Sequence, residues 1–260
     1  MTNYSESHVL DDATYSFVYE RLRTSQDAEK LAEAFELPSE LTRALQAQKV
    51  SRLVRKNFHR LKARSGSLAR EWKQGATFEE LSAQHEFSPV MMASLVLVHS
   101  LKQASRIRFN SWLKEPAKAP TPRLRTELAT IAQSDGVFSP QAHVFQTRNG
   151  RSFEEMIAEW LRSKGADFAT EVENRANGTG KTPDFLLKEP LQVNGFKAKW
   201  VECKATFGDL VETRRNLRAQ LEPYYKLFGE GMVLYYHGVQ QTHASAPGVH
   251  TATRKLLERA

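Results

Sequence analysis

The chain has 260 residues, of which 40% are apolar, and this suffices to bury the core of one large domain or of two smaller ones. Its longest apolar run, Met91 to Val98, is far shorter than the roughly 20 residues that cross a bilayer, so no membrane span is expected. A formal net charge of +7, a single cysteine and an acidic N-terminus without a basic residue favour an intracellular protein that attracts polyanions such as nucleic acids.

Helical patterns fill the first half of the chain. Apolar residues recur at spacings of three and four in Asp11 to Arg23 and in Gln26 to Phe35, and Ser39 is suited to cap a third helix that runs to about Arg64. This third segment is the most basic part of the chain. The cations expected to hold a phosphate backbone are Arg52, Arg55, Lys56 and Arg60.

Two short helices with helix-turn-helix spacing follow. The first begins after Thr77, which precedes two glutamates, and the second begins at Pro89 and extends through Leu101. The spacing is compatible with a DNA-reading unit or with a simple packed helical hairpin. The hairpin is favoured, because Val90, Met91 and Met92 at the start of the second helix offer no donors to base edges.

The organisation of the chain changes at two places. Three prolines between Glu115 and Pro122 make this segment the best linker candidate, and one more helix is expected over Arg123 to Ser134. We therefore expect a helical region over residues 1–122 that binds DNA or a partner, a helical connector over residues 123–149, and an α/β domain over residues 150–260.

The α/β domain is predicted to have the order helix, three strands, helix, strand. Asn194-Gly195 is the dipeptide best suited to a two-residue hairpin turn, because both positions tolerate a positive φ. The predicted helices are Ser152 to Lys164 and Leu210 to Phe228, and the predicted strands are Phe168 to Val172, Asp184 to Val193, Phe196 to Ala205 and Gly231 to Tyr236.

The hairpin carries the residues of chemical interest. Side chains alternate along a strand, so Glu202 and Lys204 share a face, and an ideal turn places Asp184 opposite Ala205, beside Lys204. A bulge near Pro190 would change this register. Two carboxylates beside a lysine suit phosphodiester hydrolysis with Mg²⁺, although a Glu-x-Lys pair on a strand by itself usually marks a solvated face.

The joint order of these motifs resembles the PD-(D/E)xK nuclease superfamily, through Thr182-Pro183-Asp184-Phe185 and Glu202-Cys203-Lys204. The resemblance implies a restriction-endonuclease-like αβββαβ core, in which Asp184 and Glu202 are metal ligands and Lys204 positions the nucleophile. It also implies an acid from the first core helix, Glu154, with Glu155 and Glu159 as neighbouring alternatives that an error of one turn would select. Gln220-x-x-x-Tyr224 resembles a motif that supports the site in several branches of the superfamily.

A closer resemblance is to the TPD-motif family, which includes codanin-interacting nuclease. It is carried by the TPD segment, by residues 202–209 and by residues 228–238. Family membership implies a nuclease of the nucleus or cytoplasm that uses Mg²⁺, or alternatively Mn²⁺, and acts on nucleic acid, with DNA as the expected substrate. It also implies a codanin-like protein partner. The alternative is a nuclease fold kept as a non-catalytic scaffold that binds DNA or such a partner.

A glycine-rich loop precedes the TPD segment. Gly178-Thr179-Gly180-Lys181-Thr182 ends like a Walker A loop, but Arg175 occupies the position of the required earlier glycine and a strand follows in place of a helix. ATP binding is therefore not expected. The loop is interpreted either as a connector or as a segment in which Lys181 contacts a phosphate.

Overall fold

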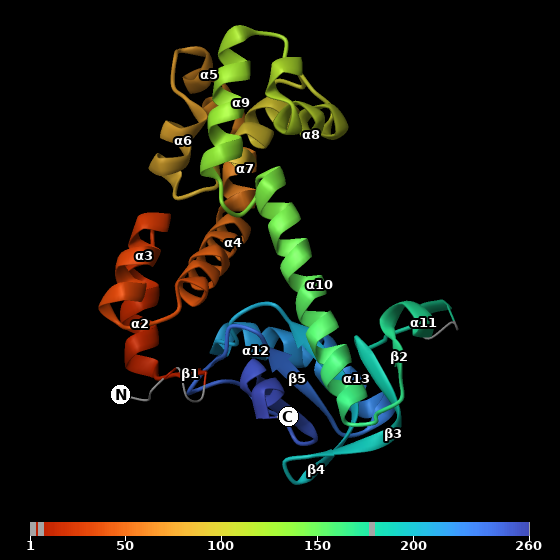
Figure 1. The fold of residues 1–260 in the computed structure, drawn as a ribbon. Helices are drawn as coiled ribbons and strands as arrows, with labels where there is room; N and C mark the ends of the chain where they lie inside the picture. The colour runs from red at the N-terminus through yellow and green to blue at the C-terminus, as the bar shows by residue number, and fades with distance from the viewer. Residues whose placement is uncertain (1–3, 5–7, 177–179, 260) are drawn as a thin grey trace. The chain divides into compact units, whose positions relative to one another are not determined.

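A computed structural model describes Tyr4, residues 8–176 and residues 180–259 (Figure 1). The chain divides into two compact units, the first formed by residues 1–45 together with 148–260 and the second by residues 46–147. Two long helices, α4 (Ser39–Ala63) and α10 (Pro140–Ser163), contribute residues to both units. Within the described part of the chain, no helix has the length and apolar character needed to span a membrane.

A five-stranded mixed sheet is the centre of the first unit. Its spatial order is β2-β3-β4-β5-β7; the two pairs from β2 to β4 are antiparallel, and the two pairs from β4 to β7 are parallel. The strands are β2 (Phe168–Thr170), β3 (Phe185–Val193), β4 (Phe196–Lys204), β5 (Gly231–Tyr235) and β7 (Val249–Thr253). Three further helical segments are α11 (Glu171–Ala176), which follows β2, α12 (Leu210–Asn216) and α13 (Glu222–Phe228). A π-helical turn, η3 (Leu217–Leu221), joins α12 to α13, and a 3-10 helix, η4 (Arg254–Arg259), follows β7.

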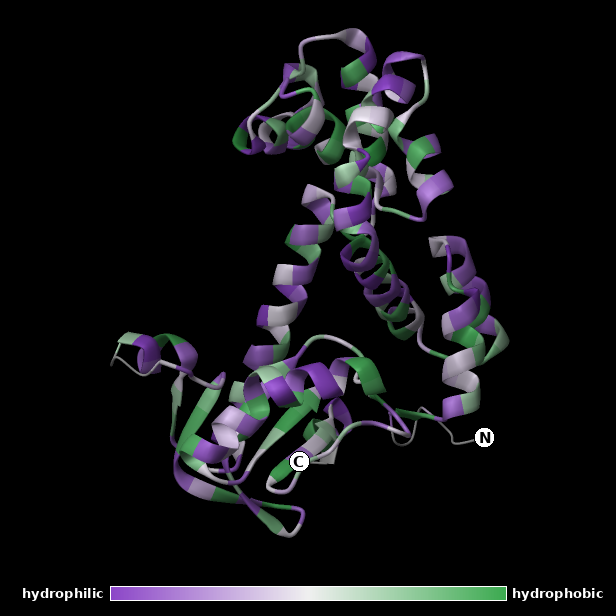
Figure 2. Ribbon diagram, turned by 180° about the vertical axis from the view of Figure 1, so that it is seen from behind, coloured by the Kyte–Doolittle hydropathy of each residue, from purple (hydrophilic) through white to green (hydrophobic). Residues whose placement is uncertain are grey.

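Helices cover both faces of the sheet. Phe153, Ile157 and Leu161 of α10 pack with Val201 and other apolar side chains on one face. On the other face, Leu217, Leu221 and Tyr224 pack around Trp200 and Tyr235. Many of the apolar residues of this unit lie on the strands (Figure 2). Because side chains alternate along β4, Trp200 and Val201 enter different cores, as the sequence pattern predicts.

The predicted elements of this unit agree with the structure in order. The hairpin turn has the expected backbone, with a φ of 43° at Asn194 and 92° at Gly195. The predicted helix over 210–228 is present, but its middle is the π-helical turn η3. Strand β7 was not predicted, because its sequence Val-His-Thr-Ala-Thr is only partly buried and has few large apolar residues.

The N-terminal segment belongs to the first unit. Strand β1 (Val9–Leu10) pairs in parallel with β6 (Val239–Gln240), while α2 (Asp12–Arg21) and α3 (Ser25–Ala34) pack with the start of α4 around Phe207. This grouping differs from the expected boundaries at 122 and 150. The apolar faces of α2 and α3 are buried against a loop almost 200 residues away, a contact that composition along the chain does not reveal.

The second unit is helical. Its core includes Trp72, Phe78, Trp112 and Leu128. Besides its parts of α4 and α10, it contains α5 (Ser65–Lys73), α6 (Phe78–His85), α7 (Pro89–Ser94), the π-helical turn η1 (Leu95–Ser100), α8 (Arg106–Lys114), the 3-10 turn η2 (Pro116–Lys118) and α9 (Pro122–Ser134).

Two expectations for this unit are modified by the structure. The proline-containing segment 115–122 is not a linker between domains, because it lies inside the unit, where Ala119 is buried in the core. The predicted second helix of the helix-turn-helix-like pair begins at Pro89, but it becomes π-helical at Leu95, and most of α7 is buried. The pair is therefore a packed hairpin whose second helix contributes to the core.

Close packing at the start of β5 requires glycine. A Cβ atom on Gly231 would lie 2.2 Å from the ring of Trp200, which is fully buried. We expect Gly231→Ala to lower the free energy of unfolding by about 3 kcal/mol, because the indole must move or the strands must separate. Urea denaturation of the wild type, of Gly231→Ala and of a control variant measures the free energy of unfolding. The matched control is Gly150→Ala on α10, where no atom lies within 4 Å and where we expect a gain of about 1 kcal/mol.

Candidate active site

A β-bulge decides which residues meet at the end of the hairpin. Leu191 pairs with Ala198 as an ideal turn demands, but beyond the bulge Phe185 pairs with Val201. Continuing this register places Asp184 next to Glu202, and not opposite Ala205 as an uninterrupted hairpin would. The bulge includes Pro190, which cannot donate a backbone hydrogen bond to the ladder.

Asp184 and Glu202 are joined by backbone hydrogen bonds. The amide of Asp184 donates to Oε2 of Glu202 at 3.2 Å, and the amide of Cys203 donates to Oδ2 of Asp184 at 2.7 Å. Each carboxylate therefore accepts a hydrogen bond from a backbone amide of the neighbouring strand segment. These bonds hold the two side chains in a defined orientation at the carboxyl end of β4.

Lys204 connects this pair to the helix on the same face of the sheet. Its Nζ donates to Oε1 of Glu202 at 2.6 Å and to Oε1 of Gln220 at 2.7 Å. Gln220 lies in the π-helical turn η3, an irregularity that is frequent at functional sites because it redirects side chains. The predicted residues Asp184, Glu202, Lys204 and Gln220 thus form one hydrogen-bonded group, which we call the carboxylate cluster.

The cluster contains more negative charge than Lys204 balances. Glu202 is only 4% exposed; burial raises its pKa to about 7, and the charge of Asp184 adds to this effect while Lys204 opposes it. Burial also raises the pKa of Asp184, against the lowering effects of the Cys203 amide and of Lys204. A buried and a half-buried carboxylate beside one ammonium are a site that a further cation would stabilise.

Glu154 lies on α10, and its side chain is exposed. Its pKa is raised by partial desolvation of the carboxyl group and then by the charges of Asp184 and Glu171, so these acids lie within electrostatic range of one another. Glu155 and Glu159, the alternatives left open by the sequence, are exposed on the same helix. The structure thus brings Glu154 near the carboxylate cluster without a direct hydrogen bond to it among the described residues.

Sequence reasoning missed Glu171. It begins α11, its amide donates to the carbonyl oxygen of Asp184 at 3.0 Å, and its charge contributes to the raised pKa values of Asp184 and Glu154. The strand predicted over 168–172 in fact ends at Thr170, so the sequence pattern placed this acid inside a strand. Its Oε1 also accepts from Arg175 at 2.6 Å.

Tyr224 supports the site indirectly. Its hydroxyl donates to the carbonyl oxygen of Thr182 at 2.9 Å, and its ring meets that of Trp200 edge-on. It therefore fixes the backbone two residues before Asp184 and does not contact the carboxylates through a hydrogen bond.

The predicted phosphate-binding cations are dispersed. Arg52, Arg55, Lys56 and Arg60 lie on the part of α4 that belongs to the second unit, whereas the cluster lies in the first. Lys181 is exposed, and its Nζ lies 3.5 Å from the carbonyl oxygen of Ala219, one residue before Gln220. Asn177, Gly178 and Thr179 of the glycine-rich loop lie outside the described residues.

The N-terminal helices anchor the loop that follows Lys204, a role that the sequence did not indicate. Asp209 is fully buried; its Oδ2 accepts from the hydroxyl of Tyr15 at 2.8 Å, and its Oδ1 accepts from the amide of Glu212 at 2.8 Å, capping α12. The ring of Phe207 stacks on Tyr15. Both ends of this loop are therefore fixed, one by the sheet and one by α2.

The oxygen donors of the cluster fit a hard divalent cation. Mg²⁺ commonly uses one or two protein carboxylates and completes its shell with water, and the half-buried Asp184 and the buried Glu202 supply two with excess negative charge. No set of three His, Cys, Asp or Glu side chains arranged to hold a metal occurs among the described residues. The single cysteine, Cys203, is half-buried, and its pKa is raised by desolvation and then by the charges of Asp184 and Glu202, which disfavours a thiolate ligand.

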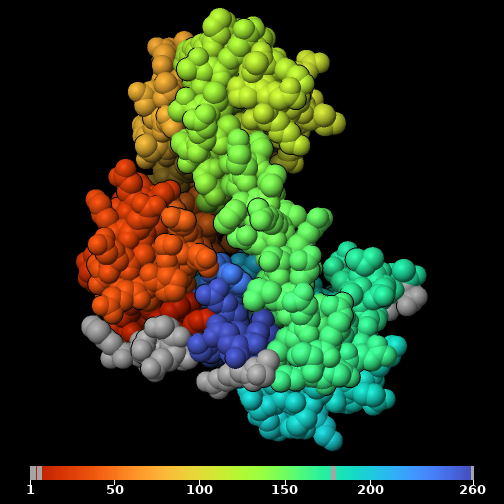
Figure 3. Space-filling model, in the orientation of Figure 1, coloured from red at the N-terminus to blue at the C-terminus, as the bar shows by residue number. Residues whose placement is uncertain are grey.

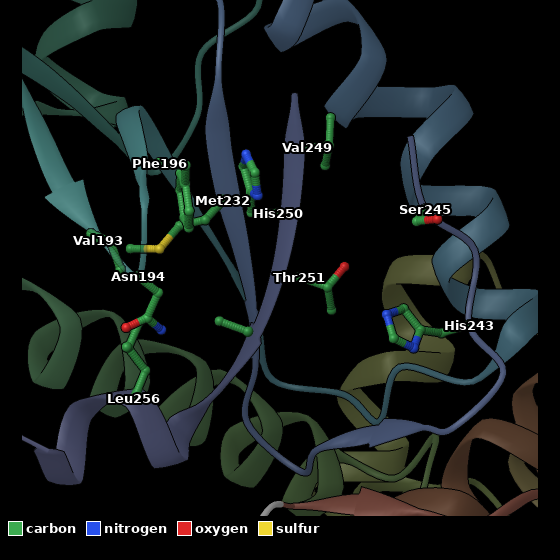
Figure 4. A pocket seen from close by; sticks show the side chains of 11 residues that line it. Val193, Asn194, Phe196, Met232, His243, Ser245, Val249, His250, Thr251 and Leu256 are labelled. Carbon is green, nitrogen blue, oxygen red and sulfur yellow. The ribbon is translucent and has the colours of Figure 1, made fainter. Parts of the chain in front are cut away.

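A separate pocket lies at the opposite end of the hairpin from the cluster. It has a volume of about 350 Å³ and is lined by residues of the β3–β4 turn, β5, β7 and η4. Figure 4 shows His250 alongside Phe196, and their rings stack with centroids 3.6 Å apart. None of the carboxylate-cluster residues lines this pocket, so it is not the candidate active site.

A family comparison covers the part of the chain that contains the cluster. The family model described as "Protein of unknown function TPD sequence-motif" matches residues 120–253, which is more than half of the chain and contains the whole cluster. The chain belongs to the TPD family. No solved structure matches the chain.

Several proteins are similar in sequence to this chain. CDAN1-interacting nuclease 1 of Homo sapiens is 30% identical over 167 residues, covering 62% of this chain and 59% of that protein. The protein of the same name from Gallus gallus is 32% identical over 166 residues, covering 61% and 56%. An uncharacterized protein of Acanthamoeba polyphaga mimivirus is 31% identical over 98 residues, covering 35% and 36%. The matches thus span under two thirds of the length of these relatives.

Proposed function

We propose that this TPD-family protein is a divalent-cation-dependent nuclease that hydrolyses phosphodiester bonds of nucleic acid, with DNA as the expected substrate. The observation that carries the proposal is the pairing of the half-buried Asp184 with the buried Glu202, to which Lys204 is hydrogen-bonded. The order of elements around it, helix, three strands, helix and strand, supports a PD-(D/E)xK core. The relatives named as nucleases support the same class of reaction.

Each residue of the cluster has a distinct part in this proposal. Asp184 and Glu202 hold Mg²⁺ or Mn²⁺, which when bound supplies Lewis-acid chemistry and lowers the pKa of a water molecule. Lys204 donates a hydrogen bond to the attacking water or to a phosphate oxygen on which charge develops. Gln220 orients Lys204 through the 2.7 Å hydrogen bond, and Tyr224 holds the TPD backbone.

Glu154 is the proton acceptor in this proposal. In hydrolysis Glu154 takes a proton from the attacking water, the water oxygen bonds to phosphorus and the bond to the leaving sugar oxygen breaks. The leaving oxygen takes up a proton from solvent, to which Glu154 releases the one it accepted. The raised pKa of Glu154 makes its carboxylate a stronger base than an ordinary surface glutamate. Glu171 reinforces this basicity through its charge.

A cleavage assay with metal removal tests the proposal. Purified full-length protein is incubated with linear, flapped and branched DNA and with RNA, in Mg²⁺, in Mn²⁺ and in EDTA. We expect cleavage of at least one substrate with either metal and complete loss in EDTA, with recovery when the metal is restored. Absence of cleavage throughout the panel, or cleavage that persists in EDTA, contradicts the proposal.

A second candidate function is binding of a codanin-like protein, in the nucleus or cytoplasm, by a nuclease fold without catalysis. The name of the vertebrate relatives favours it, since they are described as interacting with CDAN1. Co-purification of the full chain with the codanin homologue of the same organism tests it. A stable complex together with an inactive protein in the cleavage panel is the result expected for a scaffold.

A further inference from the structure

The net positive charge of the protein lies in one unit. Residues 46–147 contain 16 Lys and Arg and 7 Asp and Glu, a formal net charge of +9, whereas the remaining residues contain 21 and 23, a net charge of −2. The unit with the carboxylate cluster is thus slightly acidic. A polyanionic ligand is attracted by the helical unit, and its affinity must come mainly from there.

Cations of this unit gather around one aromatic pair. Phe58 of α4 meets His99 of η1 edge-on, with ring centroids 6.3 Å apart. Arg55 and Lys62 lie three residues before and four residues after Phe58, so they share its side of α4. Arg106 begins α8, which reaches the surface of the unit (Figure 3). We call Arg55, Phe58, Lys62, His99, Lys102 and Arg106 the basic patch.

The charges of the basic patch are accessible and close together. Arg55, Lys62, Lys102 and Arg106 are all exposed, and within the described ranges none of them has an acidic partner at ion-pair distance. Lys62 and Arg106 both lie near His99, whose ring contacts Phe58, because the pKa of His99 is lowered by desolvation and then by the charges of these two residues. Helices α4 and α8 thus present positive charge at one place.

The helix-turn-helix-like hairpin is not suited to the same task. Helix α7 has only six residues, and Val90, Met92, Ala93 and Ser94 are buried. The preceding helix α6 carries the exposed acids Glu79 and Glu80, which repel phosphate. The basic patch, and not this hairpin, is the part of the unit that fits a polyanion.

We infer that the basic patch binds the phosphate backbone of a duplex nucleic acid. Proteins that bind single strands stack bases on exposed phenylalanine, tyrosine or tryptophan rings. The basic patch has one such ring, Phe58, which is half-buried, and the exposed Phe145 of the same unit lies on α10, outside the patch. Backbone contacts set affinity without reading sequence. The inference deepens the proposed nuclease function by naming a duplex substrate and the residues that hold it.

Binding measured without catalysis tests the patch. Fluorescence anisotropy of full-length protein in EDTA, with a labelled 20-base-pair DNA duplex, the matching RNA duplex and each single strand, is recorded at several salt concentrations. For the double variant Lys62→Ala/Arg106→Ala we expect about tenfold weaker duplex binding at 0.1 M salt. The slope of log affinity against log salt should fall by about 1.8, because two phosphate contacts are lost.

The control variant removes two positive charges from another part of the same unit. Arg70 and Lys73 are exposed on α5 of the same unit, and Arg70→Ala/Lys73→Ala should weaken binding much less. The inference is overturned if both double variants weaken duplex binding equally, if Lys62→Ala/Arg106→Ala does not weaken it, or if single strands bind more tightly than duplexes. Comparing the DNA duplex with the RNA duplex shows which of the two the protein prefers. Since EDTA prevents cleavage, loss of binding in the patch variant stands even if the wild-type protein cuts nothing.

Discussion

Lys204→Met should lower the rate of metal-dependent cleavage by about 10²–10³, the cost typical of removing one donor aimed at developing charge. Methionine has a similar length but neither charge nor donor, so the loss should be in kcat with little change in KM. Single-turnover cleavage at saturating substrate is the measurement. Wild-type rates in this variant would mean that Lys204 has no part in the reaction.

Two comparisons separate catalysis from folding. Lys204 is the ion-pair partner of the buried Glu202, and removing one partner of such a pair costs about 3–5 kcal/mol of stability. Urea unfolding is therefore measured in parallel, and Glu202→Gln/Lys204→Met removes both charges together. Lys197→Met replaces an exposed lysine on the same strand and should leave cleavage and stability unchanged.

Asp184→Asn should change stability in opposite directions with and without metal. Burial raises the pKa of Asp184, so its charge destabilises the metal-free protein, and neutralising it should add on the order of 1 kcal/mol to the free energy of unfolding in EDTA. Asparagine keeps an oxygen that can accept from the Cys203 amide. The variant should lose the stabilisation that Mg²⁺ or Mn²⁺ gives to the wild type.

The size of the metal effect sets the sensitivity of this test. A metal at 100 times its Kd stabilises the folded state by about 2.7 kcal/mol, which corresponds to a rise in Tm of roughly 5 °C or more. Thermal unfolding of wild type and Asp184→Asn with and without metal gives both quantities. Asp167→Asn, which removes an exposed acid paired with Lys188, is the matched control. A metal-induced rise in Tm that survives in Asp184→Asn argues against Asp184 as a ligand.

The charge balance of the cluster explains why both predictions have large effects. Hydrogen bonds link Asp184, Glu202 and Lys204 in a group with little water to screen their charges. Removing one charge therefore changes the electrostatic energy of the other two residues. The exposed ion pair between Lys188 and Asp167 lacks this coupling, and exposed pairs contribute about 0–1 kcal/mol.

The sequence by itself determined the local elements and the identity of the cluster. Strand alternation placed Glu202 and Lys204 on one face, Asn194-Gly195 specified the turn, and the TPD segment marked Asp184, because each depends on residues close together in the chain. Only the tertiary structure decided which of these residues touch. The bulge set Asp184 beside Glu202, the π-helical turn brought Gln220 to Lys204, and the packing of α10 placed Glu154 near Asp184.

Long-range packing likewise decided how the chain divides. Composition suggested a boundary at the prolines of 115–122, but the N-terminal 45 residues fold with the sheet because Tyr15 and its neighbours bury Phe207 and bind Asp209. Such contacts join residues about 190 positions apart, and no periodicity along the chain encodes them. The net charge of the chain was readable from composition, but its concentration in residues 46–147 became visible only when the fold assigned each segment to a unit.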